Sequence, residues 1–167
     1  GADAKEPLVM FAGNFTRRKG IDRVVDVARA MPDVSFSAVG WGGGFEEFEC
    51  PGNLEIVEAR GEAYKRALAQ AAILFLPSRA ETFGLVIYEG MQAGCSIVST
   101  IPGNYAGLAI SDWSTDLAVR AIRTRIDAPD LVKTEGVDNR KRVARLTWET
   151  STSSLLDLYK RMDIAAC

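Results

Sequence analysis

Short apolar runs alternate with longer amphipathic stretches over the first two thirds of the chain. Runs such as 8–12 and 73–76 are continuously apolar, which is typical of strands buried on both faces of a parallel sheet. The runs predict strands at 8–12, 34–39, 54–57, 73–76, 96–99 and 108–110. Apolar residues at helical spacing predict helices at 20–31, 62–71, 84–93, 115–126, 136–146 and 148–164. Because the two kinds of element alternate, we expect an α/β fold: a parallel sheet of about five to six strands, helices on both faces, and a helical C-terminal third.

Three loops of this arrangement should meet at one edge of the sheet. Gly13, Gly40 and Ser78 each follow an expected strand, and all strands of a parallel sheet point the same way. Ligands of such sheets bind beyond the carboxyl ends of the strands. The order of elements therefore predicts a Rossmann-like three-layer domain with its binding site at that edge.

The composition fits one globular domain and excludes several functional classes. Of the 167 residues, 47% are apolar, which is enough for a packed core. The net charge of −2, without a concentrated basic block, argues against nucleic acid as a partner. The chain has no histidine, so it supplies no histidine-based acid, base or metal ligand.

Targeting and metal signals are equally sparse. The apolar run 71–76 is too short to cross a bilayer, and the N-terminus shows no signal peptide. The three cysteines have no C-x-x-C spacing. We therefore expect no transmembrane segment, no zinc site and a reduced, cytoplasmic setting.

The segment from Pro77 to Gly90 carries the strongest functional signal. It follows an apolar strand and opens a helix at Gly84, where unpaired N–H groups and the missing Cβ favour close approach of phosphate. Glu89 lies roughly 7–8 Å further along the helix axis. A carboxylate there can accept hydrogen bonds from two sugar hydroxyls. The segment predicts a site for a nucleoside diphosphate.

In their context these residues resemble the donor-binding signature of the family-4 retaining glycosyltransferases (group 1), which have the GT-B fold. That signature has a strand ending in Pro-Ser, then Glu-x-Phe-Gly, and a second glutamate eight residues after the first, here Glu81 and Glu89. Spacing alone is not diagnostic, because Glu47 and Glu55 share it around a turn. Segments 11–13 and 18–22 match the family's glycine loop and Lys-Gly helix start, and 146–149 with 155–159 match its closing Trp-Glu helix.

The resemblance covers almost the full chain and implies a domain organisation. Residues 7–167 correspond to the C-terminal, donor-binding domain of a two-domain GT-B enzyme. Residues 1–6 are then a tag or a remnant of an interdomain segment.

The resemblance assigns Lys19 to the diphosphate and gives its neighbour Arg18 a weaker claim. On the residues alone, Lys19 could equally well decorate the first turn of an exposed helix. One departure concerns the same site, because Asn14 stands where the family commonly has an arginine. A second phosphate cation is therefore missing unless Arg17 or Arg18 replaces it.

The two glutamates of the signature receive different roles from the resemblance. Glu89 is expected to bind the ribose hydroxyls, with a plain surface carboxylate as the alternative. Glu81 is the expected catalytic residue, facing the transferred sugar near the reacting centre. Its alternative is an acid that caps the start of the helix.

Five further residues complete the expected donor-binding set, namely Gly13, Ser78, Phe83, Gly84 and Leu85. From the residues alone, Phe83 could as easily belong to the core. The loop 101–108 is shorter than its family counterpart and lacks the family's glutamate. We therefore do not assign to loop 101–108 the donor-sugar or acceptor contacts that the family makes from this loop.

The implied activity is the hexosyltransferase-like transfer of a glycosyl group from a UDP- or GDP-linked sugar to an acceptor, with retention and without metal or other cofactor. A missing N-terminal domain of the same protein would supply the acceptor site and, in many members, a histidine. That domain could also attach a cytoplasmic enzyme peripherally to a membrane. We expect the present chain alone to bind nucleotide and to be inactive. Two alternatives remain open: a non-catalytic nucleotide-sugar binding module, and a sugar-nucleotide epimerase or phosphorylase of GT-B architecture.

Overall fold

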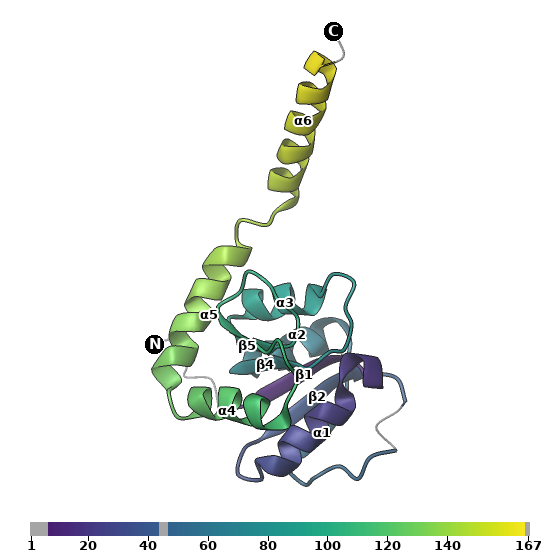
Figure 1. Cartoon of the computed structure of the whole chain (residues 1–167), viewed down its shortest axis with the longest axis vertical. Helices are drawn as coiled ribbons and strands as arrows, with labels where there is room; N and C mark the ends of the chain where they lie inside the picture. Colours follow the sequence, from purple (N-terminus) through teal and green to yellow (C-terminus); the bar gives the residue numbers. More distant parts are fainter. Residues whose placement is uncertain (1–6, 44–46, 166–167) are drawn as a thin grey trace.

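A parallel sheet of six strands forms the centre of the computed structural model, which describes residues 7–43 and 47–165 (Figure 1). The strands are β1 Val9–Asn14, β2 Phe36–Trp41, β3 Leu54–Glu58, β4 Ile73–Leu76, β5 Ser96–Ser99 and β6 Gly107–Ala109. Their order across the sheet is β3-β2-β1-β4-β5-β6, and every ladder is parallel. The predicted fold class is confirmed. Residues 1–6, predicted as a tag or interdomain remnant, lie outside the described residues.

Helices cover both faces of the sheet. They are the short 3-10 helix η1 Arg17–Lys19 and the helices α1 Ile21–Ala30, α2 Gly61–Gln70, α3 Leu85–Ala93, α4 Thr115–Ile126, α5 Pro129–Val143 and α6 Trp148–Ala165. Side chains of β1 alternate between the faces: Val9 and Phe11 pack with α1 and α4, whereas Met10 and Ala12 pack with α2 and α3. The central strands are thus buried on both sides, which explains their continuous apolar runs.

The strand order reverses at β1, and this reversal positions the site. From β1 the chain runs outward through β2 and β3, then returns to β4 on the other side of β1. The loops that follow β1 and β4 therefore leave the sheet side by side and in opposite directions. In open α/β sheets this is where ligands bind.

Helix α5 begins at Pro129, seven residues before the predicted start at 136, and ends at Val143. The sequence prediction was wrong because the first turns of α5 are polar and show little apolar periodicity. Gly136, taken as the helix start, is instead buried inside the helix, where a Cβ would lie 2.3 Å from the carbonyl oxygen of Gly94. Only glycine allows α5 to pack this closely on the end of α3.

Helix α5 also holds the shortened loop 101–108. The side chain of Asn139 is fully buried and donates to the carbonyl oxygens of Cys95 and Ala106, each at 2.8 Å. Its Oδ1 atom accepts from the Ala106 N–H at 2.6 Å. One buried amide thus satisfies backbone groups on both sides of β5.

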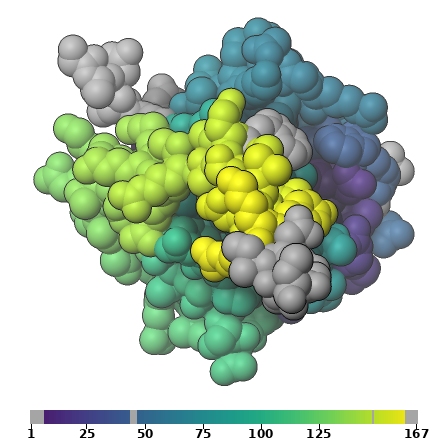
Figure 2. Space-filling model, turned by 90° about the horizontal axis from the view of Figure 1, so that it is seen from above, coloured from purple at the N-terminus to yellow at the C-terminus, as the bar shows by residue number. Residues whose placement is uncertain are grey.

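Helix α6 leaves the domain after α5 and projects away from it (Figure 1). Seen from above, it stands over the domain beside α5 (Figure 2). Every described side chain from Glu149 to Arg161 is exposed. Leu155, Leu158 and Tyr159 are each at least half exposed, so within the described residues the apolar side chains of this helix are left uncovered.

Candidate functional site

Lys19 and Glu81 are in direct contact at the carboxyl edge of the sheet. The Nζ atom of Lys19 lies 2.7 Å from each of the two carboxylate oxygens of Glu81. The hydroxyl of Ser78 donates to Oε1 of Glu81 at 2.9 Å, which further restrains the carboxylate. The side chains of Lys19 and Glu81 are only 19% and 13% exposed. Three residues of the predicted set are therefore brought together in one partly buried cluster.

The backbone around Gly20 places Lys19 in this position. Thr16 caps η1, since its Oγ1 atom accepts from the Lys19 N–H at 3.3 Å. Gly20 then adopts a left-handed conformation with φ of 83°, and a Cβ there would lie 2.3 Å from the carbonyl oxygen of Pro77. The Lys-Gly pair is needed because the chain turns directly against the Pro-Ser loop. Lys19 does not decorate an exposed helix turn, so that alternative is wrong.

Arg79 ties the loop after β4 to the start of α1. Its backbone N–H donates to the carbonyl oxygen of Arg18 at 2.8 Å. Its guanidinium donates to both carboxylate oxygens of Asp22, at 2.7 and 2.6 Å, and also to the carbonyl oxygen of Arg17. Such a two-pronged contact fixes orientation as well as distance. Arg79 therefore holds the loop that carries Ser78 and Glu81 in register with Lys19.

The electrostatics of this contact favour the ionised pair. Burial by itself would raise the pKa of the Asp22 carboxyl, but the hydrogen bond and charge of Arg79 outweigh it, so the pKa lies below its ordinary value. The hydrogen bond to Asp22 raises the pKa of Arg79 in turn. Both groups thus remain charged at neutral pH.

Glu89 is exposed on α3 and is held by a tyrosine of α2. The hydroxyl of Tyr64 donates to Oε2 of Glu89 at 2.7 Å. Burial, followed by this hydrogen bond, raises the pKa of Tyr64 above its ordinary value, so the hydroxyl stays a donor. The second carboxylate oxygen of Glu89 has no protein partner among the described residues. It is free to accept a hydrogen bond from a ligand hydroxyl.

Helix α3 presents its N-terminus to the same edge. Gly84, with φ of 69°, is its N-cap residue, and no side chain caps this end in the described part of the chain. The alternative that Glu81 caps the helix is therefore wrong. The first N–H groups of α3 remain available to an anion.

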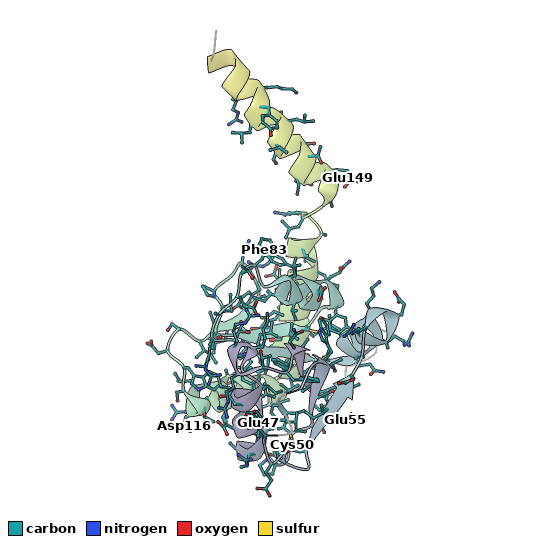
Figure 3. The ribbon with its side chains drawn as sticks, turned by 90° about the vertical axis from the view of Figure 1, so that its right-hand side faces the viewer. Glu47, Cys50, Glu55, Phe83, Asp116 and Glu149 are labelled. Atoms are coloured by element: carbon teal, nitrogen blue, oxygen red, sulfur yellow. The ribbon has the colours of Figure 1, made fainter. Side chains whose placement is uncertain are left out.

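Phe83 and Leu85 lie at the rim of the site and not in the core. They are 68% and 63% exposed, and Phe83 stacks on Tyr88 with ring centroids 5.5 Å apart. The core alternative for Phe83 is wrong. Figure 3 shows Phe83 on the side of the domain from which α6 leaves, and Glu47 and Glu55, the second glutamate pair, on the other side.

Arg17 and Arg18, the cations next to Lys19, differ in whether nearby carboxylates neutralise their charge. Arg17 lies 3.8 Å from carboxylate oxygens of Asp22 and Glu47. Arg18 is exposed and has no ion pair among the described residues. Of the two arginines considered as substitutes at Asn14, Arg18 is thus the one with free charge.

A tryptophan lies at the same edge, next to the glycine loop. Trp41 ends β2, pairs in register with Asn14 of β1, and is 41% exposed. The guanidinium of Arg60, the N-cap residue of α2, lies 5.0 Å from its ring centroid. Sequence analysis singled out only Gly40 at this strand end and so missed the exposed ring of Trp41.

Sequence reasoning also missed Tyr64, Arg79 and Asp22. Arg79 and Asp22 carry a usable signal, because Arg79 lies inside the Pro77–Gly90 segment and Asp22 follows the Lys-Gly pair directly. Tyr64 carries none, since its contact with Glu89 depends on how α2 packs on α3. No group of three metal-ligating side chains occurs among the described residues, and no described helix is long and apolar enough to cross a membrane.

Comparisons with known proteins place these residues in a family. The family model described as "Glycosyl transferases group 1" matches residues 6–128. An uncharacterized glycosyltransferase of Methanocaldococcus jannaschii is 25% identical over 168 residues, which cover 92% of this chain and 48% of that protein. A D-inositol 3-phosphate glycosyltransferase of Mycobacteroides abscessus is 30% identical over 182 residues, which cover 96% of this chain and 41% of that protein.

Solved structures share the fold. The sucrose-phosphate synthase of Thermosynechococcus elongatus matches with a TM-score of 0.80 at 24% identity, over 98% of this chain and 47% of that one. The chain spans about half the length of the curated relatives it matches, at 48% and 41% for the first two.

Proposed function

Because this chain belongs to the group 1 glycosyl transferases, we propose that it is the donor-binding half of an enzyme that transfers a glycosyl group from a nucleoside-diphosphate sugar to an acceptor with retention. The observation that carries the proposal is the cluster of Lys19, Ser78 and Glu81 beside the uncapped N-terminus of α3. A point charge and a row of backbone N–H groups at one edge of the sheet suit a diphosphate.

In this proposal the diphosphate lies between Lys19 and the start of α3. Lys19 and the N–H groups after Gly84 stabilise the negative charge that develops on the leaving diphosphate. Exposed Arg18 supplies the second cation that Asn14 does not. The proposal includes no metal ion or other cofactor, since Lys19, Arg18 and the N–H groups of α3 would carry the charge of the diphosphate.

The nucleoside would extend from α3 toward α2 and β2. Glu89 accepts hydrogen bonds from the ribose through the oxygen that Tyr64 leaves free. Arg60 lies one helical turn before Tyr64 on α2, and Arg60 covers Trp41. In this proposal the base lies toward the Trp41 ring, where stacking would contribute affinity for a uracil or guanine base alike.

Glu81 is the proposed catalytic residue. Among the described residues it is the carboxylate that contacts Lys19, and a diphosphate bound at Lys19 would bring the sugar carbon of the breaking bond near it. A hexosyl group is the proposed cargo. The acceptor site would come from an N-terminal domain of the same cytoplasmic protein, since the chain spans only about half of its relatives.

A non-catalytic nucleotide-sugar binding module is the second candidate. Two observations favour it: Asn14 at the usual arginine position, and a loop 101–108 that lacks the family's glutamate. An epimerase or phosphorylase of the same architecture would use the same diphosphate site. These candidates separate on product analysis of the full-length protein, since only a transferase requires an added acceptor.

Calorimetric titration of the chain with UDP, GDP and ADP tests the proposal. We expect at least one to bind with a Kd of roughly 10 µM to 1 mM, and Lys19→Ala and Glu89→Ala each to weaken it. Lys65→Ala is the matched control, because Lys65 pairs with Glu62 on the exposed face of α2. Absence of binding by all three nucleotides, or equal binding by the wild type and Lys19→Ala, would contradict the proposed site.

A further inference from the structure

Charged residues at the proposed donor site are ion-paired with one another. Lys19 is paired with Glu81, and Arg79 with Asp22. Asp22 also lies near Arg17. The edge proposed for a dianionic ligand therefore keeps most of its cations neutralised. Lys19 differs from Arg17 and Arg79 because its counter-ion, Glu81, is the proposed catalytic residue.

The Lys19–Glu81 contact leaves no room for an anion to reach Lys19 unopposed. Both carboxylate oxygens lie at 2.7 Å from Nζ, and both side chains are at most 19% exposed, so water screens the carboxylate poorly. Ser78 restrains the same carboxylate through a hydrogen bond to Oε1. A diphosphate at Lys19 must either displace Glu81 or sit beside its charge.

We propose that Glu81 is an internal counter-ion that competes with the diphosphate for Lys19 and so sets the specificity of the site. This inference rests on the proposed function. A bare diphosphate or a nucleoside diphosphate must take Lys19 from the carboxylate and gives the carboxylate no new partner in return. A nucleotide sugar offers hydroxyl groups that the displaced carboxylate can bind, and therefore recovers part of that loss. The pair thus favours the nucleotide sugar over free nucleoside diphosphate and speeds release of the latter after transfer.

The test compares Glu81→Gln with the wild-type chain, because this change removes the charge and keeps the shape. Calorimetry would measure the Kd of inorganic pyrophosphate, UDP and GDP. We expect Glu81→Gln to tighten binding of pyrophosphate and of the preferred nucleotide by roughly three- to tenfold, the range for loss of a partly buried competing charge. A residue that merely helps to bind the nucleotide would give weaker binding instead.

Two further variants localise the effect. In a Lys19→Ala background the added Glu81→Gln change should leave the Kd within about twofold, because the competed cation is gone. Ser78→Ala frees the carboxylate and should tighten binding in the same direction as Glu81→Gln, but less. Glu62→Gln, which breaks the exposed Glu62–Lys65 pair, is the matched control and should change nothing.

The outcomes separate this inference from the proposed function. If the wild type binds a nucleotide and Glu81→Gln binds it equally or more weakly, the counter-ion role is wrong while the donor site stands. The same holds if the tightening persists unchanged in the Lys19→Ala background. If neither protein binds any nucleotide or pyrophosphate, the proposed function fails as well.

Discussion

Lys19 and Glu81 stand 62 positions apart in the sequence, yet the Nζ atom of Lys19 lies 2.7 Å from both carboxylate oxygens of Glu81. The contact joins the loop after β1 to the loop after β4, the two loops that diverge where the strand order reverses. It therefore depends on backbone and side-chain contacts that hold these loops together. Gly20 against Pro77 and Arg79 against Asp22 are the principal ones.

Arg79→Ala should loosen the loop that carries Ser78 and Glu81, although Arg79 is not proposed to contact the ligand. We expect a loss of about 1 kcal/mol in unfolding free energy, because Arg79 is 41% exposed and its ion pair is partly screened. Nucleoside diphosphate affinity should fall by roughly fivefold. Arg123→Ala is the matched control, since Arg123 makes the same two-pronged contact with Asp33 away from the site. Equal nucleotide affinity in both variants would contradict the positioning role.

The Asp22–Arg79 contact should also make stability depend on acid pH. The pKa of Asp22 is lower in the folded chain than its ordinary value of 3.8, so the folded state favours the ionised form. The resulting stability is fully present above that value and is lost as the pH falls through the folded pKa. Urea unfolding from pH 6 to about pH 2 measures it. Asp22→Asn should flatten the acid limb; an unchanged profile would show that Asp22 contributes nothing.

Gly136→Ala should destabilise the domain through steric overlap. The new methyl group would lie 2.3 Å from the carbonyl oxygen of Gly94, which is backbone and cannot rotate away. We expect a loss of about 2 kcal/mol in unfolding free energy. Gly52→Ala is the control, because nothing lies within 4 Å of a Cβ at that position. Chemical denaturation of both variants decides whether α5 packs on α3 this tightly.

Tyr64→Phe should weaken the binding of nucleoside diphosphates and leave the binding of pyrophosphate unchanged. The change removes the hydroxyl that orients Glu89 and keeps the ring. We expect the Kd of the preferred nucleoside diphosphate to rise about three- to fivefold. The Kd of inorganic pyrophosphate, which has no ribose, should not move. Tyr159→Phe on exposed α6 serves as the control. Equal weakening of both ligands would place Tyr64 at the diphosphate instead of the ribose.

The 167-residue chain alone should bind nucleotide sugar and transfer nothing. The proposed function puts the acceptor site on another domain of the protein, because this chain spans only about half the length of its relatives. Incubation of UDP- and GDP-linked sugars with the chain, followed by analysis of released nucleotide, tests this directly. Turnover above a Lys19→Ala control would show that the chain is catalytically sufficient.

The sequence by itself determined the family and the parallel α/β fold, and it supplied the candidate residues Lys19, Ser78, Glu81 and Glu89, whose roles stay predictions. Apolar runs indicate strands because strands buried on both faces are mostly apolar, and β4 and β5 were predicted to the residue. The same reasoning failed at α5, where the polar first turns carry no apolar period. Helix α5 packs through buried Gly136 and Asn139, so the spacing of its apolar residues does not show where it begins.

Only the tertiary structure decided how the site residues relate to one another. Local sequence could not tell whether Lys19 was a surface lysine, whether Glu81 capped a helix, or whether Phe83 was core. Each of those questions depends on contacts between segments far apart in the chain. The pairing of Lys19 with Glu81 and of Tyr64 with Glu89 follows from the order of strands and the packing of α2 on α3, because side chains meet only once the sheet has brought their loops to one edge.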